Sequence, residues 1–430
     1  MQPGQVSTEH IKIAELSRKI GQILVERGDY EQAMHQFQLG LTYLEGTEHL
    51  EVARIYNEIA RVYWHQGKLD EAQKWTEKAF ELGERFLDPE ELARLLYFAG
   101  IRYFRQGENT LAEEYWLRSL QISQETRDLP TQAKLYQNLG WQAQLMGEYK
   151  KALAYLEQGR TLARECGDIS SLSYIHETVG GTYYLLGEWD KAIANLQESL
   201  NLAEQAGLRR STSRVFTALG DIYRHQGRWA EADECYQRSL ASITGMGSPQ
   251  SLSVVNLGLA LTNMERKAYA RAEELFKKAW AIAGKGFGFT ARMAAIKANM
   301  GELHVRMRRF DSAEEETTKA LELATQVNAK SELSHAIMVQ GMIATGRQQW
   351  EEAEAFYQRA LHNFEELGDR YNQGRAAFEI GMMLSKRDNS PEIQSKAKEY
   401  LQRAWKTFSE LGAQPNLEKF PSDYSPDETT

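Results

Sequence analysis

The chain has few residues of the kinds that break helices or staple small folds. Its 430 residues include only 8 prolines and 2 cysteines. Because proline breaks helices, its scarcity, together with abundant Ala, Glu, Leu, Gln and Arg, favours an almost wholly helical chain. The two cysteines, Cys166 and Cys235, exclude a disulfide scaffold and predict a reducing, cytoplasmic environment.

Long apolar runs and an excess of basic charge are also missing. The longest apolar runs fall far short of the roughly 18–20 residues that cross a bilayer. A signal peptide is not expected in residues 1–21, because Glu9, Lys12 and Glu15 interrupt any apolar stretch there. The net charge of −9 argues against general affinity for nucleic acid. We therefore predict no membrane insertion and no nucleic-acid partner.

A period of about 40 residues runs through the chain. An alanine recurs at Ala33, Ala72, Ala112, Ala152, Ala192, Ala232, Ala272, Ala313, Ala353 and Ala397. Twelve residues before each of the first nine alanines stands a Gly or Ala, as Gly140 stands before Ala152. Seven residues after each of the ten alanines stands another small residue, as Gly159 stands after Ala152. Residues seven apart share a helix face, so we expect a shallow stripe against which the helix carrying Gly140 packs closely.

A turn is expected between the two helices of each unit. Glycines mark it at Gly28, Gly67, Gly107, Gly147, Gly187 and Gly227. Left-handed backbone geometry, which glycine adopts most easily, commonly ends a helix. A large residue two positions later, such as Trp189 or Trp229, is predicted to fill the corner. Repeats seven, eight and nine replace the glycine with Lys267, Arg308 and Gln348, so the second half should be less regular.

Residues 216–223 followed by 227–232 show the pattern most fully: large–x–x–Leu–Gly–x–x–Tyr, then Gly–x–aromatic–x–x–Ala. This pattern resembles the tetratricopeptide repeat (TPR), and the resemblance covers about Ala14 to Gly412. The long period makes the array similar to those of cell-polarity scaffolds, kinesin light chains, and the helical arms of bacterial signalling ATPases and transcription regulators. The resemblance implies an all-α, right-handed superhelical solenoid of about ten TPR-like helical hairpins.

Three segments are predicted along the chain. Residues 1–13 form a lead-in, and residues 14–412 form the solenoid of ten repeats, irregular after repeat seven. Residues 413–430 hold three prolines and four acids against one lysine, which predicts an acidic, flexible tail. One hypothesis is that this tail occupies the chain's own groove and controls access to it.

Motifs that carry chemistry are missing from the sequence. It contains no GxxxxGK[ST] loop, no HExxH, no Cys/His cluster at zinc spacing and no nucleophile elbow. We therefore predict no enzyme, no cofactor and no metal. His176 occupies a core-stripe position of repeat five and is expected to be a packed histidine.

The groove is where the resemblance implies function. We number each first helix so that the residue equivalent to Gly140 is position 8. In the geometry of the family, the side chains at positions 2, 5, 9, 12 and 13 then face the groove. The predicted partner-binding residues are Arg54, Asn57, Arg61, Trp64, Arg94, Tyr97, Arg105, Lys134, Gln137, Trp141, Tyr174, Tyr184, Arg214 and Arg224. In repeats two to four, the inward positions hold five Lys or Arg, four aromatic residues and no carboxylate. Such a lining suits an acidic segment with aromatic or aliphatic anchors. Alternatively, these charges pair with acids on neighbouring helices.

The inward positions of repeats seven to nine are apolar instead. They include Val254, Leu257, Leu261, Met264, Ala295, Ala298, Val305, Met338 and Met342. Either the superhelix tightens and buries them, or an apolar helix docks there, or the chain associates with a second copy. The sequence leaves these three alternatives open.

We predict a non-catalytic scaffold or adaptor that binds a peptide or a partner-protein segment in its concave groove. One alternative is a sensor of a signalling peptide whose superhelix changes pitch, and another is a separately encoded regulatory arm of a larger ATPase or protease complex. Thirteen residues before the first repeat leave no room for the added DNA-binding module of some peptide sensors. A homo-oligomer remains compatible with this prediction.

Overall fold

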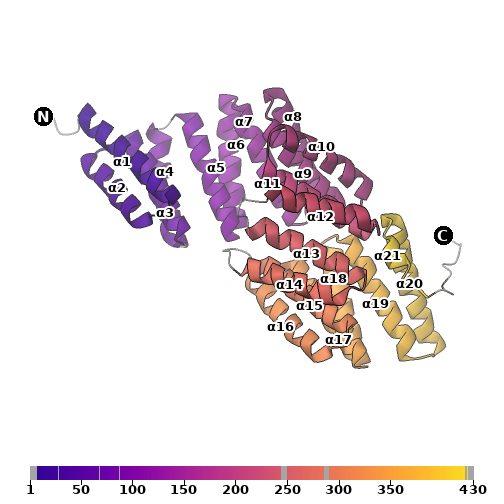
Figure 1. The fold of residues 1–430 in the computed structure, drawn as a ribbon. Helices are drawn as coiled ribbons and strands as arrows, with labels where there is room; N and C mark the ends of the chain where they lie inside the picture. Colours follow the sequence, from indigo (N-terminus) through magenta and orange to yellow (C-terminus); the bar gives the residue numbers. More distant parts are fainter. Residues whose placement is uncertain are drawn as a thin grey trace. The chain divides into compact units, whose positions relative to one another are not determined.

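A computed structural model describes residues 7–27, 29–66, 68–86, 88–243, 249–284, 290–421 and 424. Within these ranges the regular elements are helices α1 to α21, without a strand (Figure 1). None of the described helices is both long enough and apolar enough to cross a membrane. The predicted all-α class is confirmed.

The helices α1 to α20 follow one another as ten hairpins. They are α1 Thr8–Arg27 with α2 Tyr30–Tyr43, α3 Leu50–His65 with α4 Leu69–Phe86, α5 Pro89–Gln106 with α6 Asn109–Thr126, α7 Leu129–Leu145 with α8 Tyr149–Cys166, α9 Ile169–Leu185 with α10 Trp189–Gln205, α11 Arg209–His225 with α12 Trp229–Ile243, α13 Pro249–Glu265 with α14 Tyr269–Ala283, α15 Thr290–Arg306 with α16 Phe310–Gln326, α17 Lys330–Gly346 with α18 Trp350–Glu366, and α19 Arg370–Arg387 with α20 Pro391–Leu411. A short helix, α21, spans Gln414–Leu417. The predicted solenoid of about ten hairpins is confirmed.

The chain divides into two compact units. The first comprises Met1–Leu139 with Thr161–Cys166, and the second comprises Gly140–Arg160 with Gly167–Thr430. Repeats five to ten therefore belong wholly to the second unit. The cavities described below also lie within this unit.

Glycine allows the two helices of a repeat to approach closely, as the spacing predicts. A Cβ atom on Gly140 would lie 2.6 Å from Leu156 Cγ and 3.3 Å from the carbonyl oxygen of Ala152. A Cβ atom on Gly180 would meet Leu196 and Ala192 in the same way. A larger side chain at these positions would separate the helices, because the interior is already close-packed.

The turns of repeats three to nine have left-handed geometry with or without glycine. Gly187 and Gly227 have φ angles of 77° and 78°, and the replacements Lys267, Arg308 and Gln348 have φ angles of 61°, 59° and 61°. Repeats three to nine therefore keep one turn geometry, although that geometry costs a residue with a Cβ atom about 1–2 kcal/mol.

Replacing the strained residues with glycine should stabilise the fold. We expect Lys267→Gly and Gln348→Gly each to add about 1 kcal/mol to the free energy of unfolding, because glycine removes the clash at positive φ. Circular dichroism during urea unfolding would measure the change. Lys278→Gly is the control, since Lys278 is exposed within α14 and glycine there should destabilise the helix. A loss of stability in the turn variants would contradict the explanation.

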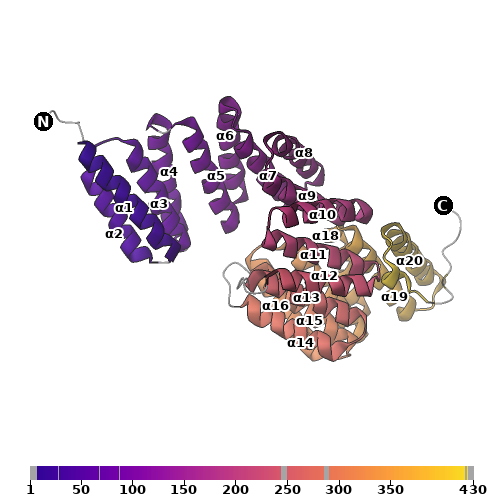
Figure 2. The same cartoon turned by 45° about the horizontal axis from the view of Figure 1, so that its top comes forward.

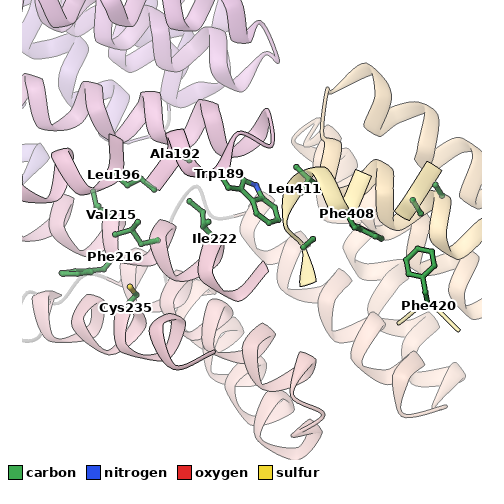
Figure 3. Packing of buried hydrophobic residues seen from close by; sticks show 14 of the residues in the cluster. Trp189, Ala192, Leu196, Val215, Phe216, Ile222, Cys235, Phe408, Leu411 and Phe420 are labelled. Atoms are coloured by element: carbon green, nitrogen blue, oxygen red, sulfur yellow. The ribbon is translucent and has the colours of Figure 1, made fainter. Parts of the chain in front are cut away.

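The second unit closes on itself between segments far apart in sequence. The hydroxyl of Tyr149 donates to the carbonyl oxygen of Leu367 over 2.8 Å, and Leu411 packs against Gly187. Trp189, 3 % exposed, belongs to the same apolar cluster as Phe408 and Leu411, and Figure 3 shows it on the side toward Leu411. The end of α20 thus packs against the turn between α9 and α10, and α21 packs against the turn between α11 and α12 (Figures 1 and 2).

Part of the segment expected to form a flexible tail belongs to this closure. Phe420 is 8 % exposed, and its ring centroid lies 4.9 Å from that of Phe378 and 5.0 Å from that of Trp405. The ammonium of Lys419 lies 3.1 Å from Glu265 Oε2. Over 413–421 the segment is therefore packed, because Phe420 anchors it; positions 422–423 and 425–430 lie outside the described residues.

Candidate ligand-binding cavities

The first helices of repeats five to ten converge on one cavity of about 210 Å³. One residue from each illustrates the lining: Tyr184 from α9, His225 from α11, Leu261 from α13, Glu302 from α15, His335 from α17 and Arg375 from α19. Side chains from six helices therefore line one half-open cavity on the inner face of the second unit.

A second, larger cavity of about 640 Å³ adjoins the first. Glu302 and Arg375 line both cavities, so these two side chains stand at their common boundary. The second cavity is also lined by Arg308, Lys386 and Lys419. Its volume falls in the range of about 300–1,000 Å³ that is usual for ligand pockets.

A network of buried ion pairs fills this boundary. Glu302, whose side chain is 3 % exposed, lies 2.7 Å from Arg375, 2.8 Å from Arg306 and 3.0 Å from His335 Nε2. Arg306 also lies 2.8 Å from Glu265. The network joins α13, α15, α17 and α19, and Lys419 connects it to the C-terminal segment.

Burial and charge oppose each other in the carboxyl groups of the network. Burial raises the pKa of Glu265, but the charges of Arg306 and Lys419 outweigh it and lower the pKa to about 2. Burial also favours the neutral form of Glu302, yet Arg375 and Arg306 hold its pKa well below the usual range. Both groups are therefore carboxylates at neutral pH.

Four rings form one corner of the first cavity. The ring centroid of His225 lies 4.0 Å from that of Tyr371, 5.6 Å from that of Trp189 and 5.9 Å from that of Tyr184. Burial and then the charge of Arg224 lower the pKa of His225 well below its usual value, so the imidazole is neutral at pH 7. The Nε2 atom of His225 lies 3.0 Å from Arg224 Nη2 and 2.9 Å from the hydroxyl of Tyr184. Because a guanidinium can only donate, Nε2 is the acceptor of the hydrogen bond from Arg224.

Two of the sequence-predicted residues, Tyr184 and Arg224, line the first cavity. The other predicted basic residue of the second unit is paired. Arg214 lies 2.5 Å from Glu177, and its guanidinium carbon lies 5.2 Å from the ring centroid of Tyr174. Trp141 is 44 % exposed, so its ring presents apolar area to solvent.

In the first unit, two of the predicted arginines contact acids. Arg54 lies 2.5 Å from Glu91 and 3.1 Å from Glu51, and Arg61 lies 2.9 Å from Glu58. Arg54, Arg61 and Arg214 therefore pair with acids on the same or a neighbouring helix, which is the alternative to a free basic lining.

The remaining predicted residues of the first unit have other surroundings. Asn57 accepts a hydrogen bond from Arg102 over 3.3 Å, and Trp64 meets His65 edge to face. Tyr97 and Gln137 are half-buried, and burial raises the pKa of Tyr97. Arg94 and Lys134 are exposed and form no ion pair within the described residues, whereas the side chain of Arg105 lies outside them.

The apolar inward positions of repeats seven to nine are largely covered. Met264, Ala298, Met338 and Met342 are buried, so the alternative of burial describes these four, whereas Val254, Leu257, Leu261, Ala295 and Val305 are half-buried. Leu261 and Met264 line the first cavity, and Val305 and Met342 line the second.

His176 is a packed histidine, as expected. It is 6 % exposed, and its Nδ1 lies 3.1 Å from Asn195 Oδ1. Nowhere in the described part of the chain do three or more His, Cys, Asp or Glu side chains gather as a metal site would require.

Sequence reasoning missed the charged groups of repeats seven, eight and ten, although a signal existed. With the Gly140-type residue counted as eight, Glu302 occupies inward position 9, Glu265 and Arg306 occupy position 13, and Arg375 occupies position 2. The same rule that selected Arg54 and Trp64 would have selected these residues.

The network predicts a specific pH dependence of stability. Because the pKa of Glu265 is lower in the folded chain than in the unfolded chain, the unfolded chain binds this proton first as the pH falls. We expect Glu265→Gln to cost on the order of 2 kcal/mol near pH 7, and the difference from the wild type to shrink between about pH 5 and pH 2. Urea unfolding followed at several pH values would measure it. A difference that stays constant down to about pH 3 would contradict the assignment.

Comparisons with known proteins identify the repeats. A family model described as tetratricopeptide repeat matches residues 51–109, 91–165 and 171–244. Residues 51–165 and 171–244 thus carry tetratricopeptide repeats, as the motif indicates. No curated protein matches it in sequence.

Several solved structures share the fold. The Rap conjugation gene regulator of plasmid pLS20, in complex with the Phr* peptide, superposes with a TM-score of 0.58 at 14 % identity, covering 87 % of this chain and 99 % of its own. The quorum sensor NprR from B. thuringiensis, in its apo form, gives 0.55 at 14 % identity, covering 81 % and 98 %. The human IFIT1 dimer with m7Gppp-AAAA gives 0.53 at 14 % identity, covering 94 % and 89 %. At these identities the likeness establishes the fold alone.

Proposed function

We propose, from the tetratricopeptide repeats that this chain carries, that it is a non-catalytic interaction protein whose second unit binds a peptide or an extended segment of a partner protein. The ligand lies in the two adjoining cavities on the inner face of repeats five to ten. The observation that carries this proposal is the convergence of α9, α11, α13, α15, α17 and α19 on one half-open cavity.

The lining of the cavities supports a peptide as the ligand. Apolar side chains such as Leu261 and Met342 stand beside charged ones such as Glu302 and Arg375. A peptide offers both apolar side chains and charged or polar groups, and apolar sites with a few fixed polar groups are the usual form of a binding pocket. The ion pairs hold Arg375 and Arg306 in place before any ligand arrives, which reduces the entropy that binding costs.

The structural neighbours support the same class of ligand. The plasmid regulator is described in complex with a peptide, and NprR is described as a quorum sensor. The proposal for this chain rests on its own cavities, and the neighbours add that a fold of this kind accommodates a peptide.

A sensor is the second candidate function, and one observation favours it. The first cavity is lined by His225 of α11 and by Tyr371 of α19, which belong to the two sides of the closure. A ligand that contacts both sides has a different affinity for a closed and an opened superhelix, and it therefore shifts the balance between them.

For the first unit, we keep the proposal of a groove for an acidic or aromatic partner segment. Its most available cations are the exposed Arg94 and Lys134, with Tyr97 beside them on the first helices of repeats three and four. The paired residues Arg54 and Arg61 would exchange their present carboxylate partners for those of the ligand. A cytoplasmic location and an acidic partner remain part of this proposal.

Filling the first cavity should abolish peptide binding. Ala295 on α15 lines this cavity of about 210 Å³, and Ala295→Trp would occupy much of it. We expect acid to release short peptides from the wild-type protein purified from a cell extract. The amount released from the variant should be at least about tenfold lower, which corresponds to a loss of roughly 1.4 kcal/mol or more in binding free energy. Mass spectrometry of the released peptides would make the comparison.

Ala230→Trp serves as the matched control, since Ala230 is exposed on α12 and lines neither cavity. Circular dichroism would first establish that both tryptophan variants have the helicity of the wild type. Equal peptide content in all three proteins would contradict binding in the first cavity.

A further inference from the structure

We infer that the two cavities bind a short peptide in one direction, with its free C-terminal carboxylate between Arg308 and Lys386 in the second cavity and its free ammonium terminus toward Glu332 and Asp369 in the first. This inference rests on the proposed function and adds the chemical class and the orientation of the ligand. The juxtaposition that carries it is an excess of cations in one cavity beside an excess of carboxyl groups in the next.

The second cavity holds the excess of cations. Its lining includes Arg306, Arg308, Arg375, Lys386 and Lys419, against the carboxyl groups of Glu302 and Glu379. Burial raises the pKa of Glu379, which lowers its ability to neutralise these cations.

Most of these cations already have partners. Arg306 and Lys419 contact Glu265, and Arg375 contacts Glu302. Arg308 and Lys386 are exposed and form no ion pair with any described residue. These two side chains are therefore the ones left to bind an anion from outside.

The first cavity has the opposite balance. Its lining includes Glu265, Glu302, Glu332 and Asp369, against Arg224 and Arg375. Arg375 contacts Glu302, and Arg224 lies 3.6 Å from Asp221. No described cation lies within ion-pair distance of Glu332 or Asp369, so these carboxyl groups are the ones left to bind a cation.

Asp369 and Glu332 are well placed for an ammonium group. Asp369 accepts hydrogen bonds from the backbone and the side-chain amide of Asn372, over 3.0 Å and 2.7 Å, which fixes its carboxylate at the start of α19. Burial raises the pKa of Glu332 by more than the nearby Arg292 and His335 lower it, and a bound ammonium would favour its charged form again.

The boundary between the cavities cannot supply these contacts. Glu302 and Arg375 bind each other, and Glu302 also binds Arg306 and His335. Breaking such a buried pair is costly, so a ligand gains most from the unpaired groups at either side. A ligand with opposite charges at its two ends therefore binds in one orientation, because reversal brings like charges together.

Arg308 offers a substitution that removes the charge without harming the backbone. It occupies the left-handed turn position with a φ of 59°, where repeats three to six have glycine. Arg308→Gly thus removes the guanidinium and relieves the strain at once. Lys267 provides the matched control, since it is a cation at the same turn of repeat seven, with a φ of 61°, and lines neither cavity.

The test uses synthetic random pentapeptide libraries that contain no Asp, Glu, Lys, Arg or His, so that only the termini carry charge. One library has both termini free, a second is amidated at the C-terminus, and a third is acetylated at the N-terminus. Peptides retained by the immobilised full-length protein are measured by mass spectrometry. The proteins compared are the wild type, Arg308→Gly with Lys386→Ala, and Lys267→Gly.

We expect the wild type to retain the free library at least about tenfold better than either capped library, as the loss of a charge-assisted contact implies. The Arg308→Gly, Lys386→Ala protein should retain the free and the amidated libraries alike, yet still discriminate against the acetylated one. Lys267→Gly should behave as the wild type. If the double variant fails to fold, the comparison is repeated with the single variant Arg308→Gly, which is expected to be at least as stable as the wild type.

The outcomes separate this inference from the proposed function. Equal retention of all three libraries by the wild type overturns the orientation but leaves peptide binding standing. Retention that appears only when Asp or Glu is added to the library overturns the terminal carboxylate in favour of a side chain. If the wild type retains no library of any kind, with or without charged residues, the proposed function fails and the inference fails with it.

Discussion

The packing of α20 and α21 against α9 to α11 closes the second unit, whose inner face carries the buried ion-pair network of Glu302. Trp189, Phe408 and Leu411 belong to one apolar cluster drawn from both sides of this contact. Because the unit is closed, Glu302 and its partners lie away from water, where a charge pair is strong and an unpaired charge is costly. In an open solenoid the same pairs would be exposed and would each contribute only about 0–1 kcal/mol.

This closure also explains why the two halves of the array use charge differently. On the first helices of repeats two to four, arginines such as Arg54 and Arg61 contact acids of their own or the next repeat. In repeats seven to ten the network extends across α13, α15, α17 and α19, and Arg306 binds two carboxylates at once. The inner surface of the second unit is thus arranged before binding, whereas the ion pairs of the first unit link neighbouring repeats.

The sequence predicts the repeat better than it predicts what the repeats do together. The spacing of Gly140 and Ala152 predicts their close contact, because that contact lies within one hairpin and recurs with the period. The contact of Tyr149 with Leu367 spans 218 residues and belongs to no period, so a repeat pattern carries no sign of it. Pairing of Arg54 with Glu91 and of Arg214 with Glu177 could have been found, since each acid lies 37 residues away, close to one period.

The most direct test of the account is to map which helices exchange their backbone amide hydrogens more slowly when a peptide is bound. Hydrogen–deuterium exchange would be measured for the wild type with and without a pentapeptide library with free termini, and peptic fragments would resolve individual helices. The account predicts slower exchange in α11, α15 and α19, whose side chains line the cavities, and no change in α1 to α6. Protection confined to α1 to α6, or to an outer helix such as α12, which lines neither cavity, would contradict it.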